Sequence, residues 1–311
     1  MKTFEKVADF NKNKATIITI GTFDGVHLGH QKILNQLTNE AKKSNLKSLV
    51  LTFFPHPRMV LQKESDIKLI NTIAEKQALC SDMAIDYLVI QPFNKAFSRY
   101  TALEFVRDIL VEQLHMKKLI IGYDHQFGKN REGGIEELQE FGLMFDFEVI
   151  EIDKQELNTV AVSSTKVRNA LREGNITLAN SYLGHSYTIT GPVVSGKKLG
   201  RTIHFPTANI HVPELYKLIP KDGVYIVKSV IDSHMYYGML NIGNRPTVGG
   251  THRTIEVHFF DFDKDIYYKT IQLQILKRLR DEHKFDSIES LVKQLQKDKK
   301  EVLVIIKKEQ L

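Results

Sequence analysis

From residue 15 to residue 152, short apolar runs alternate with amphipathic segments, and only a few folds accommodate that order. The apolar runs predict strands, and segments whose apolar residues recur every three or four positions predict helices. The predicted strands are 15–20, 46–53, 87–90, 119–121 and 147–152, and the predicted helices are 31–43, 72–83, 102–114 and 135–144. This alternation implies a parallel sheet with helices on both faces. Ligands of such sheets bind at the carboxyl ends of the strands.

The pattern changes after two more predicted helices, 164–173 and 176–183. Beyond Gly184, short runs that carry threonine and tyrosine are broken by glycine and proline, which is typical of an antiparallel barrel or sandwich. These runs are 187–194, 223–231, 235–242, 255–260 and 271–275, and an amphipathic helix is expected from 287 to about 299. At 311 residues, two domains are expected. The predicted fold is α/β, with a doubly wound parallel-sheet domain over 1–183 and an antiparallel β-barrel domain with a C-terminal helix over 184–311.

The composition restricts the kinds of ligand and the cellular compartment that suit this chain. Its net charge of +6 is mild and its lysines are dispersed, which suits small anionic ligands and does not single out nucleic acid. A single cysteine excludes an internal disulfide and fits a reducing compartment. The amino terminus lacks the apolar core of a signal peptide, and no apolar run is long enough to span a bilayer. We therefore expect a cytoplasmic protein with no membrane partner.

A glycine-rich turn joins the first predicted strand to the first predicted helix, and residues 21–30 read GTFDGVHLGH. Such a turn directs backbone N–H groups and the positive helix end at an anion, and His27 and His30 share one helix face. Two surface histidines, or half of a metal site, are the alternative interpretations. The flanking glycines favour a nucleotide phosphate. The expected phosphate-binding residues of this turn are Gly21, Phe23, Gly25, His27 and His30.

The helix predicted over 164–173 opens with two hydroxyls and a cation one turn later, Ser164, Thr165 and Arg168. Helix capping alone explains the serine, whereas the three together also form a phosphate grip, because arginine offers a fixed fork of donors. With the glycine-rich turn, this helix resembles the nucleotidyltransferases that transfer AMP from ATP. The resemblance implies that the histidines contact ATP phosphates and that the helix holds the β and γ phosphates.

Two further loops of the first domain follow predicted strands. Residues 122–128 form a glycine-flanked turn, in which Asp124 is expected near the acceptor or a magnesium ion; a loop packed by Phe127 is the alternative. Residues 53–57 read FFPHP and are able to form the wall of a site for a flat aromatic ligand, with Phe54 as the contact. Packing is the alternative interpretation of this loop as well.

In the second domain, residues 191–198 nearly form a phosphate-binding P-loop. That motif is excluded because its last position is lysine, which cannot coordinate magnesium, and because no helix is predicted to follow. Thr207 and Asn209 are expected to face the same side of a strand and offer oxygens to a hard cation such as magnesium, and an ordinary strand entry after Pro206 is the alternative. Glu256 lies on an alternating strand. Inside a barrel it would be able to take a proton from a substrate hydroxyl, and outside it would be a solvated charge.

Several motifs of the second half look like the riboflavin kinase signature. They are residues 196–201, 205–210, 223–225, 241–247, 256–258 and 280–285. In this order, the two halves resemble the bacterial bifunctional riboflavin kinase/FMN adenylyltransferases, and the resemblance covers nearly the whole chain. One position departs from that pattern: where the family usually has glycine before the Phe-Pro-Thr-Ala-Asn block, this chain has His204. A side chain there is expected to alter loop closure over the nucleotide.

The resemblance implies two reactions. The barrel phosphorylates the 5′-hydroxyl of riboflavin with ATP and Mg²⁺, and the amino-terminal domain then joins AMP to FMN, which gives FAD and pyrophosphate. Thr207 and Asn209 match magnesium and phosphate ligands, and Glu256 matches the catalytic base. Further expected ATP contacts are Gly196, Gly200 and Arg201, and expected flavin contacts are Asp124, Phe54, Tyr225 and Arg280.

Other functions are conceivable from the sequence alone. One half of the enzyme could be silent, although the motifs of both halves are intact. A flavin-binding regulator or an RNA-binding protein would need an aromatic and basic surface stripe, which a chain without tryptophan and with dispersed lysines does not suggest.

Overall fold

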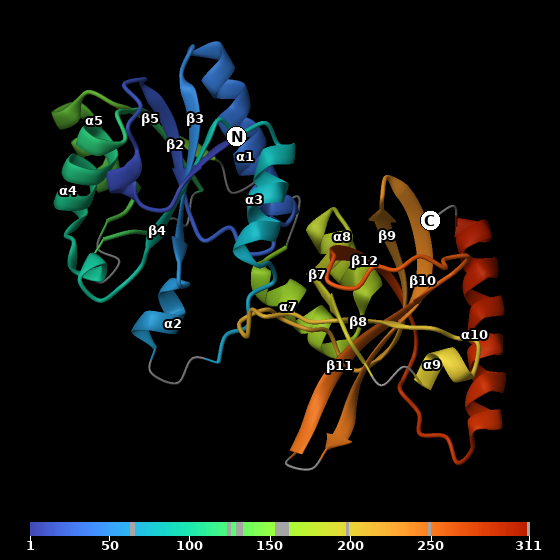
Figure 1. The fold of residues 1–311 in the computed structure, drawn as a ribbon. Coiled ribbons are helices and arrows are strands. Elements are labelled where there is room, and N and C mark those ends of the chain that lie inside the picture. The colour runs from blue at the N-terminus through green and yellow to red at the C-terminus, as the bar shows by residue number, and fades with distance from the viewer. Residues whose placement is uncertain are drawn as a thin grey trace. The chain divides into compact units, whose positions relative to one another are not determined.

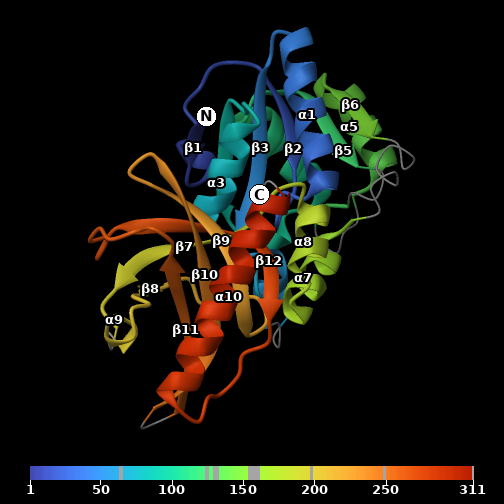
Figure 2. The same cartoon turned by 90° about the vertical axis from the view of Figure 1, so that its right-hand side faces the viewer.

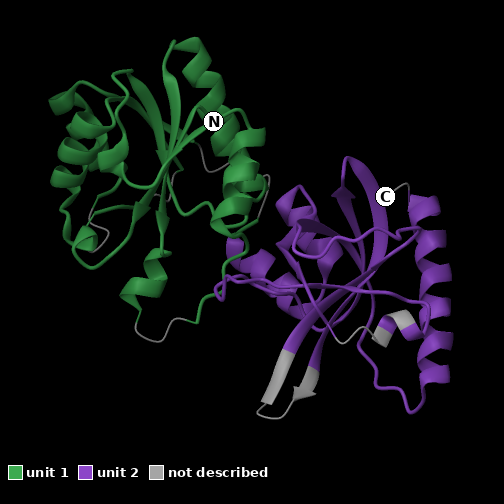
Figure 3. Ribbon diagram, in the orientation of Figure 1, with its two compact units in different colours: residues 1–163 green, residues 164–311 purple. Residues whose placement is uncertain are grey.

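The computed structural model describes residues 1–62, 66–122, 126–128, 133–152, 162–196, 199–247 and 250–309. The chain forms two compact units, which we call the sheet unit (residues 1–163) and the barrel unit (residues 164–311) (Figure 3). Each unit is described by itself below.

The sheet unit is built on a six-stranded sheet of order β1-β4-β3-β2-β5-β6, in which every neighbouring pair is parallel (Figure 1). Its strands are β1 (Lys2–Phe4), β2 (Thr16–Ile20), β3 (Lys47–Phe54), β4 (Tyr87–Pro92), β5 (Met116–Gly122) and β6 (Glu148–Ile152). The chain runs from β2 to β3 and β4 on one side and returns to β5 and β6 on the other. The order therefore reverses between β2 and β5, which is where ligands of doubly wound sheets bind.

Helices cover both faces of this sheet, as the alternating pattern predicts (Figure 1). The helices are α1 (Leu28–Lys43), α2 (Pro57–Leu61), α3 (Ile73–Asp82), α4 (Ala102–Glu104), the π-helix η3 (Phe105–Gln113) and α5 (Ile135–Phe145), with short turns η1 (Val7–Asp9) and η2 (Phe97–Arg99). Side chains alternate across a strand. Ile17 consequently joins the cluster under α1 and α3, and Ile18 joins the cluster under η3 and α5.

The barrel unit is a closed antiparallel barrel of order β10-β11-β8-β7-β12-β9, as predicted. Its elements are α7 (Ser164–Glu173), α8 (Ile176–Leu183), β7 (Tyr187–Val194), α9 (Leu199–Thr202), β8 (Ala208–Ile210), β9 (Gly223–Ile231), β10 (His234–Thr247), β11 (Gly250–Phe259), β12 (Thr270–Arg280) and α10 (Ile288–Glu309). The final helix α10 runs along the barrel (Figure 2). Its Val302 is fully buried in a cluster with Ile226, Met239 and Phe260 of the strands.

The helices α7 and α8 pack with the barrel. The Asn180 amide of α8 donates to the carbonyl of Ile275 at 2.9 Å and accepts from the backbone N–H of Tyr187 at 2.8 Å. The compact units therefore divide before α7, whereas the sequence places the domain boundary after α8. The functional boundary at 183/184 stays a prediction.

A buried ion pair fastens α10 to the end of β12. The Arg280 guanidinium donates to the Asp298 carboxylate, with Nη2 and Oδ2 2.7 Å apart, and the Asp298 side chain is 1% exposed. We expect Asp298→Ala to lower the free energy of unfolding of the barrel by about 3 kcal/mol, because a largely buried guanidinium loses its counter-charge. Urea denaturation measures this effect.

The matched control is Glu309→Ala, which removes a more exposed pair between the same two elements, Lys277 of β12 and Glu309 of α10. This change should cost less than about 1 kcal/mol. Equal losses from the two substitutions would contradict a special role for the buried pair.

Candidate active sites

The glycine-rich turn (residues 21–27) lies at the carboxyl end of the central strand β2 and has an unusual backbone. Phe23 and Val26 adopt positive φ angles of 44° and 40°. Left-handed backbone is rare for a bulky or β-branched residue and costs about 1–3 kcal/mol, so the surrounding structure must hold it in place. Gly21 is required by a close approach, because a Cβ there would meet the Phe23 ring at 3.0 Å.

Hydrogen bonds from residues 70–76 and from α1 hold this turn. The Lys76 Nζ donates to the Thr22 carbonyl at 2.6 Å, and the Asp24 carboxylate accepts from the backbone N–H of Ile70 at 2.9 Å. The Gln31 side chain donates to the Val26 carbonyl at 2.8 Å. The turn is therefore fixed from outside as well as by its own sequence.

The two histidines lie together at the start of α1. His27 caps the helix, and its Nδ1 accepts from the His30 backbone N–H at 3.3 Å. The two rings stack with centroids 3.6 Å apart, and the Phe23 ring meets His30 edge-on at 5.1 Å. The structure thus brings together the histidines and Phe23 of the predicted phosphate site.

One ring nitrogen of His30 lacks a hydrogen-bond partner among the described residues. This atom, Nδ1, is buried, and burial without a partner typically costs about 1–3 kcal/mol. Burial, and then the positive charges of His27 and Lys76, lower the pKa of His30 well below its usual 6.5. His30 is therefore neutral at neutral pH.

The remaining residues predicted for adenylyl transfer lie in several places. Ser164, Thr165 and Arg168 open α7 in the barrel unit, where Arg168 is buried. Their meeting with the histidines stays a prediction. Phe54 is half-buried at the end of β3. Asp124 lies outside the described residues.

The barrel unit gathers a second polar cluster where β8 pairs with β11. Asn209 and Glu256 are direct partners in the register, and the Thr207 hydroxyl donates to the Glu256 carboxylate at 3.3 Å. Glu256 is 8% exposed, so it is not a solvated charge. These side chains supply hydroxyl, amide and carboxylate oxygens, a donor set that suits Mg²⁺. In the described part of the chain, no three His, Cys, Asp or Glu side chains gather into a group that could hold a metal.

Two glycines between β7 and β8, Gly196 and Gly200, lie in close contacts. A Cβ on Gly196 would lie 2.3 Å from the Asn209 amide nitrogen, and one on Gly200 would lie 2.2 Å from the Phe205 carbonyl oxygen. His204 adopts a positive φ of 60°. A left-handed backbone explains why glycine suits this position in proteins with the resembling motif. Arg201 lies in α9, but its side chain is outside the described structure.

Both halves of the chain match family models, in the order that the motifs predict. Residues 9–166 match the model described as FAD synthetase, and residues 183–306 match the model described as riboflavin kinase. The chain is 38% identical over 304 residues to the bifunctional riboflavin kinase/FMN adenylyltransferase of Buchnera aphidicola subsp. Schizaphis graminum, covering 96% of each chain. The chain belongs to this family.

Other bifunctional riboflavin kinase/FMN adenylyltransferases are similarly related. The Escherichia coli K12 protein is 38% identical over 283 residues, which cover 91% of this chain and 90% of that protein. The Listeria monocytogenes protein is 37% identical over 301 residues, which cover 96% and 94%. The family of the chain and the order of its two catalytic halves are thereby confirmed.

A solved structure shares the fold over nearly the whole chain. It is described as a macrolide-efflux protein from Streptococcus pneumoniae and is 31% identical in sequence to this chain. The two structures superpose with a TM-score of 0.85, over 96% of this chain and 97% of that one. Among the described residues of this chain, no helix is both long and apolar enough to cross a bilayer.

For a riboflavin kinase/FMN adenylyltransferase, two of the expected flavin contacts have unexpected surroundings. Tyr225 is fully buried, and its hydroxyl donates to the Lys221 carbonyl. The Arg280 guanidinium donates hydrogen bonds to the Asp298 carboxylate of α10. Their flavin contacts stay predictions, and the structure gives both side chains a role in holding the barrel together.

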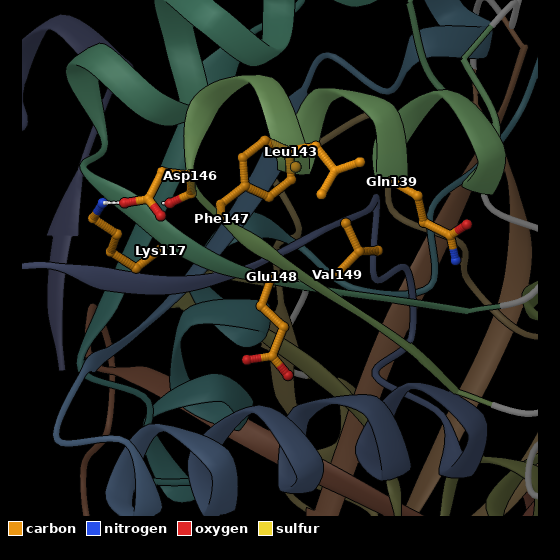
Figure 4. A pocket seen from close by; sticks show the side chains of 8 residues that line it. Lys117, Gln139, Leu143, Asp146, Phe147, Glu148 and Val149 are labelled. Carbon is orange, nitrogen blue, oxygen red and sulfur yellow. Dashed lines mark hydrogen bonds and ion pairs between the residues drawn. The ribbon is translucent and has the colours of Figure 1, made fainter.

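A hollow lies between α5 and β6 (Figure 4). It is lined by Lys117, Gln139, Gly142, Leu143, Asp146, Phe147, Glu148 and Val149, and an ion pair of 2.7 Å joins Lys117 and Asp146. Lys117 and Glu148 stand near the amino ends of β5 and β6. Because ligands of such sheets bind at the carboxyl ends, this hollow is not the nucleotide site.

The contact between Gly196 and Asn209 gives a direct test of the kinase loop. We expect Gly196→Ala to lower kcat/KM for riboflavin phosphorylation about tenfold, because the new methyl group displaces the Asn209 amide by an ångström or so. Steady-state kinetics with varied ATP measures the loss.

Ser195→Ala is the matched control, since it alters the neighbouring, exposed residue and should leave the rate unchanged. FAD formation from supplied FMN should be unaffected by either change. A wild-type kinase rate in Gly196→Ala would show that the loop does not depend on this close approach.

Proposed function

We propose that the half of the chain that matches riboflavin kinase transfers the γ-phosphoryl group of ATP to riboflavin, and that the half that matches FAD synthetase transfers AMP from a second ATP to the resulting FMN. The observation that carries this proposal is the pairing of Asn209 with Glu256 beside Thr207, in the half of the chain that matches riboflavin kinase. The strained turn with its two histidines supports the second reaction.

In the proposed kinase step, the riboflavin 5′-oxygen attacks the γ-phosphorus and ADP leaves. Glu256 accepts the hydroxyl proton, and its low exposure together with the hydrogen bond from Thr207 holds the carboxylate in one position. Thr207 and Asn209 would hold Mg²⁺, which neutralises phosphate charge when bound. Gly196 and Gly200 let the loop approach the nucleotide closely, and Arg201 would add a positive charge.

In the proposed adenylyl transfer, a phosphate oxygen of FMN attacks the α-phosphorus of ATP and pyrophosphate leaves. The nucleophile is already an anion, so the protein needs no strong base and contributes position and charge. His27, His30 and the start of α1 face the phosphates, and an approaching anion favours the protonated form of His30. Ser164, Thr165 and Arg168 would hold the β and γ phosphates, with Asp124 and Phe54 near the flavin.

We further propose that the partners are the small molecules riboflavin, FMN and ATP, with no nucleic acid and no membrane, and that the protein works in the cytoplasm. Its mild positive charge and dispersed lysines favour small anions over a nucleic-acid backbone.

The position of a label in ATP tests both steps. Riboflavin with γ-labelled ATP should give labelled FMN and then labelled FAD, whereas α-labelled ATP should label FAD alone. An α-label that never enters FAD would overturn the adenylyl transfer, and a γ-label absent from FMN would overturn the kinase.

A further inference from the structure

A buried lysine beneath the glycine-rich turn has no part in the reactions described so far. Lys76 lies in the first turn of α3 and is 4% exposed. Lysine is rarely buried so fully unless it is paired. Within the described residues, its Nζ makes one hydrogen bond, the 2.6 Å contact with the Thr22 carbonyl.

Keeping this charge inside the protein is costly. Desolvation of a buried ammonium costs several kcal/mol, which an uncharged side chain would avoid. Burial lowers the pKa of Lys76, and the Asp24 carboxylate opposes that shift. Next to Asp24 in space, the Asn71 amide is buried without a partner among the described residues. This corner of the protein is therefore not arranged for stability alone.

The contacts of Lys76 connect it to His30 through the glycine-rich turn. Residues 70–76 bind the turn at two points, Lys76 at the Thr22 carbonyl and the backbone N–H of Ile70 at the Asp24 carboxylate. Phe23 lies between these points with its positive φ, and its ring packs edge-on against His30. A shift of the Thr22 carbonyl would therefore move the ring that supports His30.

We propose that Lys76 is a positioning residue for adenylyl transfer, which holds the glycine-rich turn in its phosphate-binding conformation through the Thr22 carbonyl. This inference rests on the proposed function of the sheet unit. It also accounts for the burial of a charge whose desolvation an uncharged side chain would avoid. The positive charge of Lys76 has a second effect, because it helps to keep His30 neutral until a phosphate arrives.

The test is Lys76→Met in the full-length protein. We expect kcat for FAD formation from FMN and ATP to fall at least tenfold, with a smaller change in KM for ATP, while riboflavin phosphorylation stays at the wild-type rate. The pKa of His30, followed by NMR of its imidazole, should rise because a neighbouring positive charge is gone. A purely structural role would reduce the folded fraction and leave kcat per folded molecule unchanged.

Leu79→Ala is the control, since it weakens packing on the same helix without removing a hydrogen bond to the turn, and it should leave kcat unchanged. If Lys76→Met fails to fold, Lys76→Gln, which keeps a donor but not the charge, replaces it, and its kcat must fall at least threefold. A wild-type kcat in the folded variant overturns the inference alone. Wild-type protein that makes no FAD from FMN overturns the proposed function, and this inference with it.

Discussion

Glu256→Gln should lower kcat for riboflavin phosphorylation about a thousandfold, while FAD formation from supplied FMN continues at the wild-type rate. Glutamine has the shape of glutamate and can still accept the hydrogen bond from Thr207, but it cannot take a proton from the substrate hydroxyl. Separate assays of FMN formation and FAD formation by chromatography measure the two activities.

The control for this substitution is Glu289→Gln, which makes the same chemical change at an exposed position of α10. Both activities should survive in that variant. Kinase activity retained in Glu256→Gln would refute the assignment of Glu256 as the base. Loss of both activities would indicate misfolding or coupling between the two reactions.

His30→Ala should have the opposite selectivity. FAD formation should fall about a hundredfold or more, because the transition state loses a positioned donor to the phosphates, and riboflavin phosphorylation should stay intact. The control is His115→Asn, which removes an exposed imidazole from the sheet unit and suits the positive φ of 52° at that position.

The same variant should change the pH dependence of stability. The pKa of His30 is lower in the folded protein than in the unfolded chain, so the unfolded chain binds more protons between that lowered pKa and about 6.5. The free energy of unfolding therefore falls as the pH drops below about 6.5. His30→Ala should remove this contribution, and thermal unfolding from pH 7 to pH 5 measures it. Unchanged FAD formation together with an unchanged pH profile would contradict both roles of His30.

Local patterns were sufficient to predict the parts of this fold that depend on nearby residues. The bounds of α7, α8, β7 and β9 agree with the expected segments, because apolar spacing and helix-ending glycines act within a few residues. The strands β1 and β8 have three residues each and are too short to show a period. The prediction of a helix over 102–114 did not anticipate that most of it is the π-helix η3.

Contacts between distant segments explain what the sequence could not predict. Lys76 lies on the helix α3, where a lysine is expected to face solvent, and its partner Thr22 is 54 residues away. The alternation around Glu256 does not predict whether its side chain faces into the barrel or into solvent. The pairing of β8 with β11, which are distant in the sequence, places Glu256 beside Asn209. Arg280 was expected at the flavin because of its motif, and only the packing of α10 reveals its pair with Asp298.

A chromatographic time course of the purified protein with riboflavin, ATP and Mg²⁺ tests the central claim most directly. We expect FMN to rise first and then to give way to FAD, with one pyrophosphate released for each FAD formed. Accumulation of FMN without any FAD would contradict the activity assigned to the sheet unit, and the absence of both products would contradict the account of both sites.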